Sequence, residues 1–365
     1  MDKLHIVHTE SSMGWGGQEI RILTEAEGLA ARGHRITLVT PPGANIYREG
    51  KARGLEVVPL AIGRKKISGV TALLPWLRNN LPDVINTHSS TDAWLAAVAC
   101  RFLDRPPAIV RTRHISTPVL DNFATRWLYS TATRHIVTTG ERLRNELIDR
   151  NGFDPSRITS VPTGIDTSKF VPGDKYRARR QLGLPEDRPT LGIIATLRDW
   201  KGHTYLLDAF AGLASHQVGL LIVGDGPQRE ALKRRIDGLG LGARVQMPGN
   251  QADVVPWFQA LDVFVLPSYA NEGVPQAVLQ AMSCGIPVVS TSVGSIPEAV
   301  RNEDTGLIVA PRDAEVLREA IERLLANAEL RLRFGDAARK AALQKFGLAV
   351  MLDKMETVFS GAIRA

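Results

Sequence analysis

Short apolar runs alternate along the whole chain with stretches whose apolar residues recur at helical spacing. The first half contains seven runs that predict strands, near residues 3–9, 35–40, 56–61, 83–87, 107–112, 135–139 and 158–161. The second half contains six more, near residues 190–196, 218–223, 244–247, 263–266, 287–291 and 306–309. Intervening stretches such as residues 17–33 predict amphipathic helices. This alternation favours parallel sheets that are covered by helices on both faces.

Thirteen strands are too many for one ordinary doubly wound sheet, and 365 residues suit two α/β domains. We place the first domain at residues 1–165 and the second at 166–348, with a last helix near 349–362 after a helical stretch over 317–346. The polar segment 167–189, which is punctuated by proline and glycine, is predicted to be a linker with one short helix. Because ligands of doubly wound sheets bind at the carboxyl ends of the strands, two facing domains predict a cleft there.

The composition predicts a globular protein of a reducing compartment. Apolar residues make up 44% of the chain, and no apolar run reaches the roughly 18 residues that a membrane span needs. The first residues run directly into a strand-like pattern and do not resemble a signal peptide. Cys100 and Cys284 lie far apart in apolar stretches and form neither a CxxC motif nor a metal-ligand pattern, which predicts buried thiols and a cytoplasmic protein.

The net charge of +7 is concentrated in the first half of the chain. Residues 1–165 contain 21 Lys and Arg against 15 Asp and Glu, whereas the remainder contains 24 against 23. A basic half suits an anionic partner, such as nucleic acid, phospholipid headgroups or a phosphorylated acceptor. A merely soluble basic surface is the alternative.

One basic segment of this half raises the question of a membrane surface. Arg64, Lys65 and Lys66 directly precede residues 67–81, ISGVTALLPWLRNNL, in which Trp76 and several leucines lie at helical positions. Such a helix can lie on an anionic bilayer, so peripheral contact with the membrane is one hypothesis. A helix that packs on the sheet before the next strand is the alternative, and we favour it slightly.

The second half carries a motif at the end of a predicted strand, EGVPQAVLQ over residues 272–280. It follows the apolar run VFVLPS, so it lies at the carboxyl edge of the predicted sheet and opens a helix. Pro275 suits a helix start, and Gly273 lets the backbone approach a ligand closely. The N–H groups of a helix N-terminus bind anions, and Glu272 beside them can accept hydrogen bonds from sugar hydroxyls. A capped helix that merely begins with Glu is the alternative.

A second motif, TLRDWKG over residues 196–202, also follows a predicted strand. Arg198 binds phosphates bidentately and Lys201 adds a point charge, so the pair suits a diphosphate. A third strand ends in the turn VGDGP (223–227), which predicts either a ligand contact or a tight turn with Asp225 as a helix cap. The chain contains no Asp-x-Asp pair and no metal-ligand spacing, so we expect protein cations, and no metal, to neutralise the diphosphate.

In the first half, the loop SSMGWGGQE (11–19) follows the first predicted strand and precedes a helix. It can cradle a phosphate, but it does not match G-x-G-x-x-G, and the chain has no P-loop motif, so NAD and ATP are weak candidates. Two further strand ends carry His88 and His114, the latter beside Arg111 and Arg113. One histidine alone is more often structural, but two at strand ends of a basic half predict that at least one lines the ligand cleft.

With these motifs the chain resembles the retaining glycosyltransferases of family 4, whose GT-B fold consists of two doubly wound Rossmann-like domains facing a central cleft. The resemblance covers essentially the whole length, and its C-terminal motifs are more specific than the glycine loop and the histidines. It is carried by GWGGQE (14–19), the strand ends at His88 and His114, VPTGID (161–166), TLRDWKG, VGDGP, DVFVLPS (262–268), EGVPQAVLQAMSCGIPVVST (272–291), VGSIPEAV (293–300) and TGLIVAP (305–311).

The resemblance implies transfer of a sugar from a UDP- or GDP-linked donor to a glycan or lipid-linked acceptor, with the anomeric configuration retained. Because the first half is basic, we expect a membrane-associated acceptor in bacterial cell-surface polysaccharide or lipopolysaccharide synthesis, and an enzyme that is cytoplasmic or peripheral on the inner face of the cytoplasmic membrane. No cofactor is expected, because the nucleotide sugar is a substrate. The sequence shows no clear nucleophile for a double displacement, so by analogy we favour a front-face mechanism.

The resemblance also implies roles for individual residues, with the acceptor bound by the first domain and the donor by the second. Catalytic roles would fall to His114, Glu272, Arg198 and Lys201. Donor contacts would come from Gly16, Gly17, Arg198, Lys201, Met247, Gly249, Glu272, Gly273, Val274, Pro275 and Gln280, and acceptor contacts from Trp15, His88, Arg111 and Arg113. The last helix would cross back to the first domain, and the linker would act as a hinge for closure.

Gln280 departs from the pattern of the family, which has a second Glu eight residues after the first. In the family this position accepts hydrogen bonds from the ribose hydroxyls. A glutamine carbonyl can also accept them, but without charge, so we expect a weaker ribose contact and an active enzyme.

Three other functions fit parts of the sequence. A nucleotide-sugar epimerase of the same fold would act without an acceptor and is expected to carry further acid–base residues. A phosphorylase or sucrose-type transferase would use a soluble acceptor. A basic nucleic-acid-binding protein would account for the charge, but the chain shows no basic stretch interleaved with aromatic residues and no recognition-helix pattern.

Overall fold

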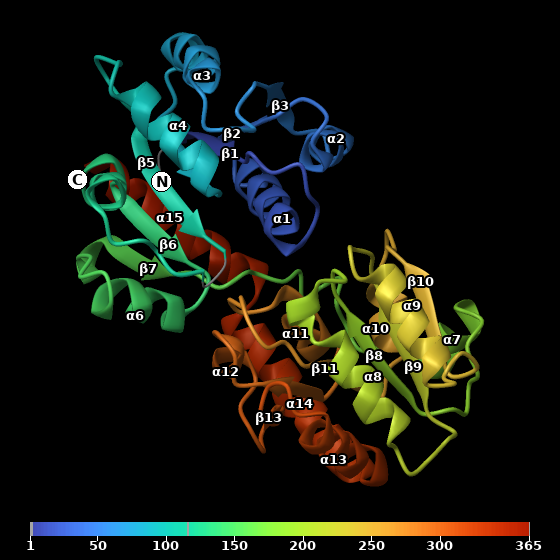
Figure 1. Cartoon of the computed structure of the whole chain (residues 1–365). Coiled ribbons are helices and arrows are strands. Elements are labelled where there is room, and N and C mark those ends of the chain that lie inside the picture. The colour runs from blue at the N-terminus through green and yellow to red at the C-terminus, as the bar shows by residue number, and fades with distance from the viewer. Residues whose placement is uncertain (1–2, 115–116, 365) are drawn as a thin grey trace. The chain divides into compact units, whose positions relative to one another are not determined.

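The computed structural model describes residues 3–114 and 117–364 and divides the chain into two compact units (Figure 1). The N-terminal unit comprises Met1–Gly164 together with Leu348–Ala365, and the C-terminal unit comprises Ile165–Gly347. The domain boundaries expected from the sequence lie one residue further along the chain. Each unit contains one parallel sheet with its own core, and the units are described separately below.

The seven strands predicted for the first half are all present in the N-terminal unit. They are β1 (His5–Thr9), β2 (Arg35–Thr40), β3 (Glu56–Pro59), β4 (Val84–Thr87), β5 (Ala108–Arg113), β6 (His135–Thr138) and β7 (Ile158–Ser160). They pair in parallel in the order β3-β2-β1-β4-β5-β6-β7. The connections are α1 (Gly17–Ala31), α2 (Asn45–Ala52), α3 (Ile67–Asn80), α4 (Ser90–Cys100), α5 (Phe123–Arg126), a π-helical turn (Trp127–Ala132), α6 (Glu141–Asp149) and a 3-10 turn (Pro155–Arg157).

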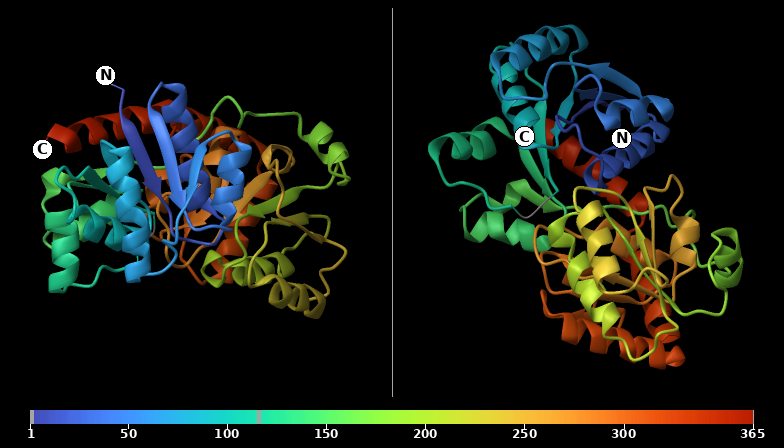
Figure 2. Two further views of the ribbon diagram at one scale, coloured as in Figure 1. Left: turned by 90° about the horizontal axis from the view of Figure 1, so that it is seen from above. Right: turned by 45° about the vertical axis from the view of Figure 1, so that its right-hand side comes forward.

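Both faces of this sheet are buried, because successive strand residues point to opposite sides. Ile6 and Val84 pack toward α1 and the C-terminal helix α15 (Leu348–Arg364), whereas Val7 and Ile85 pack toward α3 and α4. The last helix is therefore present as predicted, and it lies against α1, β4 and β5 (Figures 1 and 2). The result is a doubly wound sheet.

The six strands predicted for the second half are likewise present in the C-terminal unit. They are β8 (Thr190–Ile194), β9 (Gly219–Val223), β10 (Val245–Gly249), β11 (Val263–Leu266), β12 (Val288–Thr291) and β13 (Gly306–Val309), paired in parallel in the order β10-β9-β8-β11-β12-β13. The helices are α7 (Lys175–Gln181), α8 (His203–Ala211), α9 (Arg229–Gly238), α10 (Val255–Gln259), α11 (Gln276–Ser283), α12 (Ile296–Ala299), α13 (Ala314–Ala326) and α14 (Ala328–Lys345), with a 3-10 turn at Asp199–Lys201.

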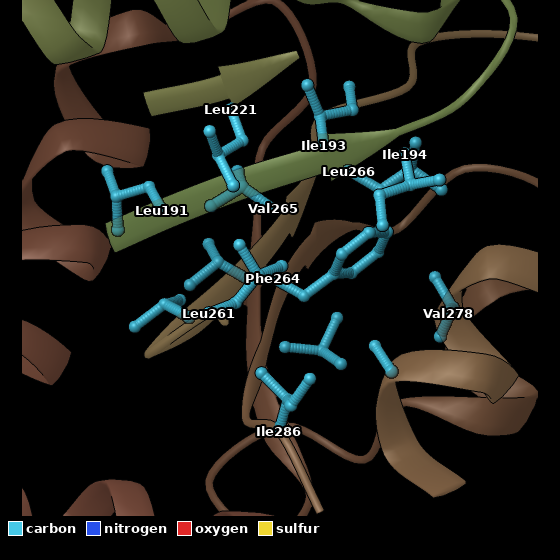
Figure 3. Close-up of a cluster of buried hydrophobic side chains, with 14 of the residues drawn as sticks. Leu191, Ile193, Ile194, Leu221, Leu261, Phe264, Val265, Leu266, Val278 and Ile286 are labelled. Atoms are coloured by element: carbon cyan, nitrogen blue, oxygen red, sulfur yellow. The ribbon is translucent and has the colours of Figure 1, made fainter. Parts of the chain in front are cut away.

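The core of the C-terminal unit is built from the apolar strand residues that the sequence pattern singles out. Figure 3 shows Leu191 of β8 and Phe264 of β11 among other buried side chains, with Val278 of α11 nearby. The long helical stretch predicted near the chain end is divided in two. Asn327 interrupts it, because its side-chain oxygen accepts the N–H of Leu330 and so caps α14.

The segment 167–189 contains the short helix that was predicted, but the prediction of a linker is wrong. The segment belongs to the C-terminal unit and buries Phe170 and Arg179. The guanidinium of Arg179 pairs with Asp262 at 2.5 Å and donates to the Ala260 carbonyl at 3.0 Å. Charged residues made the segment look solvent-exposed, whereas Arg179 is buried because a partner from a distant part of the chain satisfies it.

Both cysteines are buried and form no disulfide. Burial raises the pKa of Cys100 and of Cys284 to about 12, so each thiol stays protonated near neutral pH. The prediction of buried thiols is confirmed.

His203, the first residue of α8, is only 2% exposed, and neither of its ring nitrogens has a hydrogen-bond partner among the described residues. Burial, with a smaller contribution from the positive charge of Lys201, lowers its pKa to about 4. The folded state therefore keeps this ring neutral, while the unfolded chain takes up a proton as the pH falls below about 6.5. Stability is lost between these two values, by about 2 kcal/mol at pH 5.

We expect His203→Phe to reduce the acid sensitivity of the C-terminal unit. The melting temperature of the wild type should fall by roughly 4–8 °C more than that of the variant between pH 7 and pH 5, as differential scanning calorimetry can measure. His216→Gln, which changes an exposed histidine of the same unit, serves as the control and should keep the wild-type pH dependence. Parallel pH profiles for the wild type and His203→Phe would contradict the prediction.

Candidate functional site

The strand order places one topological switch point in each unit. In the N-terminal unit the order reverses between β1 and β4, and in the C-terminal unit it reverses between β8 and β11. Open α/β sheets bind ligands at such switch points, outside the carboxyl ends of the strands. The glycine loop, the two histidine strand ends, TLRDWKG and EGVPQAVLQ follow these strands or the adjacent β5, whereas VGDGP follows β9.

In the C-terminal unit, the loops after β8 and β11 are held in direct contact. The Tyr269 N–H donates to the Trp200 carbonyl at 2.8 Å. Gly202 has a φ of +77°, and a Cβ at this position would lie 2.1 Å from the carbonyl oxygen of Pro267. Only glycine permits this approach, so the TLRDWKG loop is fixed against the loop that carries Glu272.

Lys201 and Glu272 form an ion pair between these two loops. The Lys201 Nζ lies 2.6 Å from the Glu272 Oε1, and the Ser268 hydroxyl donates to the same oxygen at 2.6 Å. The Glu272 side chain is 6% exposed and that of Lys201 is 18% exposed. The sequence assigned the two residues to different parts of one ligand, and the structure brings them together as partners. Because Oε1 receives both donors, Oε2 is the oxygen left for hydrogen bonds to a ligand.

Arg198 lies three residues before Lys201, and its side chain is exposed. Its guanidinium carbon is 5.5 Å from the centroid of the Trp200 ring. The cation–π contact restrains a charge that reaches solvent at the same loop. The loop therefore offers one exposed cation, Arg198, and one that is already paired, Lys201.

The helix α11 begins at Gln276, with Pro275 in extended conformation as the preceding residue. Gly273, Val274 and Pro275 are buried beneath the loop surface. A Cβ on Gly294, whose φ is +56°, would lie 2.0 Å from the Glu272 carbonyl oxygen, so a second glycine fixes the backbone here. Gln280 lies one turn into α11 and is half-buried.

Asp225 of the turn VGDGP does not cap the following helix. That helix, α9, begins at Arg229 with Gln228 before it, whereas the Asp225 carboxylate accepts the N–H of Gly226 at 2.7 Å. At the end of the neighbouring strand β10, two backbone carbonyls accept hydrogen bonds from other residues of the protein. The Gly249 carbonyl accepts the N–H of Gly224 at 2.9 Å, and that of Met247 lies 3.4 Å from an Arg229 nitrogen.

In the N-terminal unit, the glycine loop leads into α1, which begins at Gly17 with Gly16 extended before it. Trp15 is half-buried against a small apolar cluster that includes Ile22 and Ile46. Glu10, at the end of β1, is fully buried and accepts from the Ser12 N–H at 2.7 Å and from the Gln18 side chain. Burial, with the nearby Asp92 charge, raises its pKa to about 8. Glu10 was missed in the sequence, although it lies at a strand end like the histidines.

A row of three histidines crosses the switch point of this unit. The His8 Nδ1 lies 2.9 Å from the His88 Nε2, and the His88 Nδ1 lies 2.9 Å from the His114 Nε2. Burial lowers the pKa of His8 to about 3 and, with the neighbouring positive charges, holds the pKa of His88 and of His114 well below the usual value. All three rings are therefore neutral near pH 7. His8, the inner end of the row, was not singled out in the sequence.

The row fixes the positions of the ring protons. The His8 Nε2 is buried without a hydrogen-bond partner among the described residues, so a proton there would be an unsatisfied donor. Placing the proton on Nδ1 lets His8 donate to His88, which must then donate through its own Nδ1 to His114. His114 receives this bond at Nε2 and carries its proton on Nδ1.

His88 and His114 line a pocket of about 530 Å³ in the N-terminal unit, together with Arg111 and Arg113. The structure therefore gathers four of the predicted residues at one site. Trp15, Gly16 and Gly17 do not line this pocket, although Gln18 does. Lys65, which the sequence suggested only as a membrane contact, lines it as well.

The helix proposed as a membrane-surface helix is α3, and its leucines pack inside the protein. Leu73 and Leu77 are buried in the core with Leu74 and Trp76 beside them, and α3 packs on α4. The packing alternative therefore describes this helix. In the part of the chain that the structure describes, no helix has both the length and the apolar content to cross a membrane.

Comparison with protein families matches both halves of the chain. The model described as "Glycosyltransferase Family 4" matches residues 15–169, and that described as "Glycosyl transferases group 1" matches residues 174–341. One similar protein is the D-inositol 3-phosphate glycosyltransferase of Mycobacterium tuberculosis (strain ATCC 25618 / H37Rv). The two sequences are 29% identical over an alignment of 367 positions, which covers 90% of this chain and 75% of that protein.

Solved structures share the fold over the whole chain. A glycosyltransferase from Rickettsia africae ESF-5 superimposes with a TM-score of 0.89 at 19% identity and covers 100% of both chains. Anabaena HepE in complex with UDP-glucose gives a TM-score of 0.88 at 21% identity, covering 98% of this chain and 100% of its own. WaaG, a glycosyltransferase involved in lipopolysaccharide biosynthesis, gives 0.75 at 18% identity, covering 97% and 99%.

The two family matches follow one another along the chain, and the shared fold extends over both units. The chain thus belongs to the glycosyltransferases of the group 1 and family 4 type: it is a glycosyltransferase enzyme with the GT-B fold.

Proposed function

We propose that the protein is a retaining glycosyltransferase that takes a sugar from a UDP- or GDP-linked donor. The observation that carries the proposal is the arrangement of Lys201, Glu272 and exposed Arg198 at the switch point of the C-terminal unit. Cations for a diphosphate and a carboxylate for sugar hydroxyls lie together there, beside the start of α11. The UDP-glucose held by Anabaena HepE, which has the same fold, supports a nucleotide-sugar donor.

In the proposed reaction, an acceptor hydroxyl oxygen forms a bond to the anomeric carbon on the side from which the diphosphate departs. The bond between that carbon and the phosphate oxygen breaks, and the diphosphate leaves with the electron pair. The acceptor proton passes to a leaving phosphate oxygen, so neither a protein nucleophile nor a metal is required. Arg198 and Lys201 stabilise the charge that develops on the diphosphate.

The remaining residues take positioning roles in this proposal. Glu272 and the backbone of Gly273 and Val274 hold the donor sugar, and Gln280 accepts from the ribose. His114 contributes its Nδ1–H beside the transferred sugar, in the tautomer that His88 and His8 impose. Gly16 and Gly17 approach the donor, and the strand end at Met247 and Gly249 borders the base.

The acceptor is proposed to be a glycan or a lipid-linked sugar in bacterial cell-surface polysaccharide synthesis, bound by the N-terminal unit. The pocket with His88, Arg111 and Arg113 supports that assignment, and Trp15 lies at the entry to α1. WaaG acts in lipopolysaccharide biosynthesis, and the mycobacterial relative acts on an inositol phosphate. We place the enzyme in the cytoplasm, with access to acceptors at the inner face of the membrane.

Calorimetric titration with UDP, GDP, ADP and CMP in metal-free buffer tests the donor site. We expect one nucleoside diphosphate to bind, and Arg198→Ala or Lys201→Ala to weaken it roughly 10- to 100-fold, the worth of a hydrogen bond to a charged group. Lys233→Ala removes an exposed cation of α9 in the same unit and is the control. Equal losses in all three variants, or no binding to the wild type, would overturn the proposal.

Glu272→Gln tests the assignment of the carboxylate to the donor sugar. The variant should bind the free nucleoside diphosphate at least as well as the wild type, because Lys201 is released from its partner. The ratio of its affinity for the nucleotide sugar to its affinity for the nucleoside diphosphate should be roughly ten-fold lower than in the wild type. An unchanged ratio between the two ligands would refute the assignment.

Gln280→Glu tests the ribose contact. A charged acceptor makes a stronger hydrogen bond to a hydroxyl, so the affinity for the preferred nucleoside diphosphate should rise several-fold. The 2′-deoxy nucleotide provides the control, because it lacks one of the hydroxyls and should gain less. An equal gain for both nucleotides, or a loss for both, would show that residue 280 does not bind the ribose.

A further inference from the structure

The pocket of the N-terminal unit concentrates positive charge without an acidic counterpart. Lys65, Arg111 and Arg113 line it, and none of its described lining residues is an aspartate or glutamate. Burial and the charge of Arg111 lower the pKa of Lys65, which shows that the two cations are close enough to repel each other. Cations in such proximity are costly unless an anion compensates them.

Of the three cations, Arg111 is the most buried. It is only 5% exposed, and its Nε and Nη1 have no hydrogen-bond partner among the residues that the structure describes. Its guanidinium carbon lies 4.7 Å from the centroid of the Tyr129 ring, and Tyr129 also hydrogen-bonds to this side chain, but these contacts leave Nε and Nη1 unpaired. A buried guanidinium with unpaired donors is a site at which a bound anion gains affinity.

Burial lowers the pKa of Arg111 and the charge of Asp92 opposes this shift, but the two side chains form no ion pair among the described residues. One carboxylate oxygen of Asp92 accepts from the Thr9 hydroxyl at 2.7 Å and from the His88 N–H at 2.9 Å. The other accepts from the N–H and the hydroxyl of Ser89. These four donors occupy Asp92 in capping α4 and in holding the loop at His88, so Arg111 is left for a ligand.

The other lining groups indicate what kind of anion fits. The Lys65 Nζ donates to the Ser90 hydroxyl at 2.9 Å and lies 5.9 Å from the centroid of the Trp94 ring. A guanidinium fork, a lysine point charge and serine hydroxyls together offer more donors than a carboxylate can use, but they suit the several oxygens of a phosphate. Trp94, whose ring stacks on that of Trp127, adds an apolar group to the lining beside them.

We propose that this pocket binds a phosphate ester carried by the acceptor, with Arg111 and Lys65 as its principal contacts. The inference rests on the proposed function, because it takes the pocket to be the acceptor site. It deepens that function by giving the acceptor a chemical class, a phosphorylated sugar or a phosphate-linked lipid. It also gives a reason for the basic character of the first half of the chain that does not involve α3 lying on a bilayer.

The test is a calorimetric titration of inorganic phosphate into the protein saturated with the nucleoside diphosphate that the donor titration identifies, UDP or GDP, so that the donor site is already occupied. The wild type should bind phosphate, and Lys65→Ala should weaken that binding roughly ten-fold, since one charge-assisted hydrogen bond is lost. Arg111→Met should weaken it at least as much. Lys66→Ala removes the neighbouring exposed lysine, which does not line the pocket, and should leave the binding unchanged.

Lys65→Ala changes an exposed side chain, so it keeps the test valid if the buried Arg111→Met fails to fold. Phosphate binding that is absent from the wild type, or equal in Lys65→Ala and Lys66→Ala, would overturn the proposal. If neither UDP nor GDP binds but phosphate binding still depends on Lys65, the donor assignment fails and the phosphate site stands. If one of them binds and phosphate does not, the donor assignment stands and the phosphate site fails.

Flotation with vesicles distinguishes the two sources of the phosphate ester. Vesicles of equal parts phosphatidylcholine and phosphatidic acid should carry the wild type and Lys66→Ala, but not Lys65→Ala, if the phosphate belongs to a lipid. Lys65-dependent binding of inorganic phosphate without any flotation supports a soluble sugar phosphate. Flotation that all three proteins share, with no Lys65-dependent phosphate binding, would mean general surface attraction and would contradict the proposal.

Discussion

Parallel strand pairing is the constraint on which the rest of this structure depends. Every strand of each sheet points the same way, so the residues that follow β1, β4 and β5, or β8 and β11, must emerge at one edge. Open α/β sheets bind ligands where the strand order reverses. Both groups of candidate residues lie at these edges, one group in each unit.

The two edges use charge in different ways. In the C-terminal unit, Lys201 and Glu272 neutralise each other at 2.6 Å, which keeps both residues ordered in a nearly buried position. A ligand that brings both negative phosphates and sugar hydroxyls can engage each partner separately, so the ion pair holds the site ready at little electrostatic cost. Glycines 202 and 294 fix the two loops closely enough for the pair to form.

In the N-terminal unit, neutral and charged groups lie side by side without such pairing. The three histidines of the row stay uncharged because burial and nearby cations oppose protonation. Arg111 remains charged. Asp92 is the acid that influences its charge, but the Asp92 carboxylate accepts hydrogen bonds from the backbone N–H groups of His88 and Ser89. This unit therefore presents a hydrogen-bond donor of fixed tautomer beside uncompensated positive charge, and the complement of that surface is an anionic, hydroxyl-bearing molecule.

The sequence by itself determined the thirteen strands, the doubly wound class and the motifs at the carboxyl edges, because these depend on local periodicity and on residues adjacent in the chain. It did not determine which side chains become partners. The Arg179–Asp262 pair that draws a supposed linker into the C-terminal unit, the row from His8 to His114, and the Lys201–Glu272 contact all join residues far apart in sequence. Only the tertiary structure decided these, because burial and pairing of polar groups depend on distances that the folded chain alone sets.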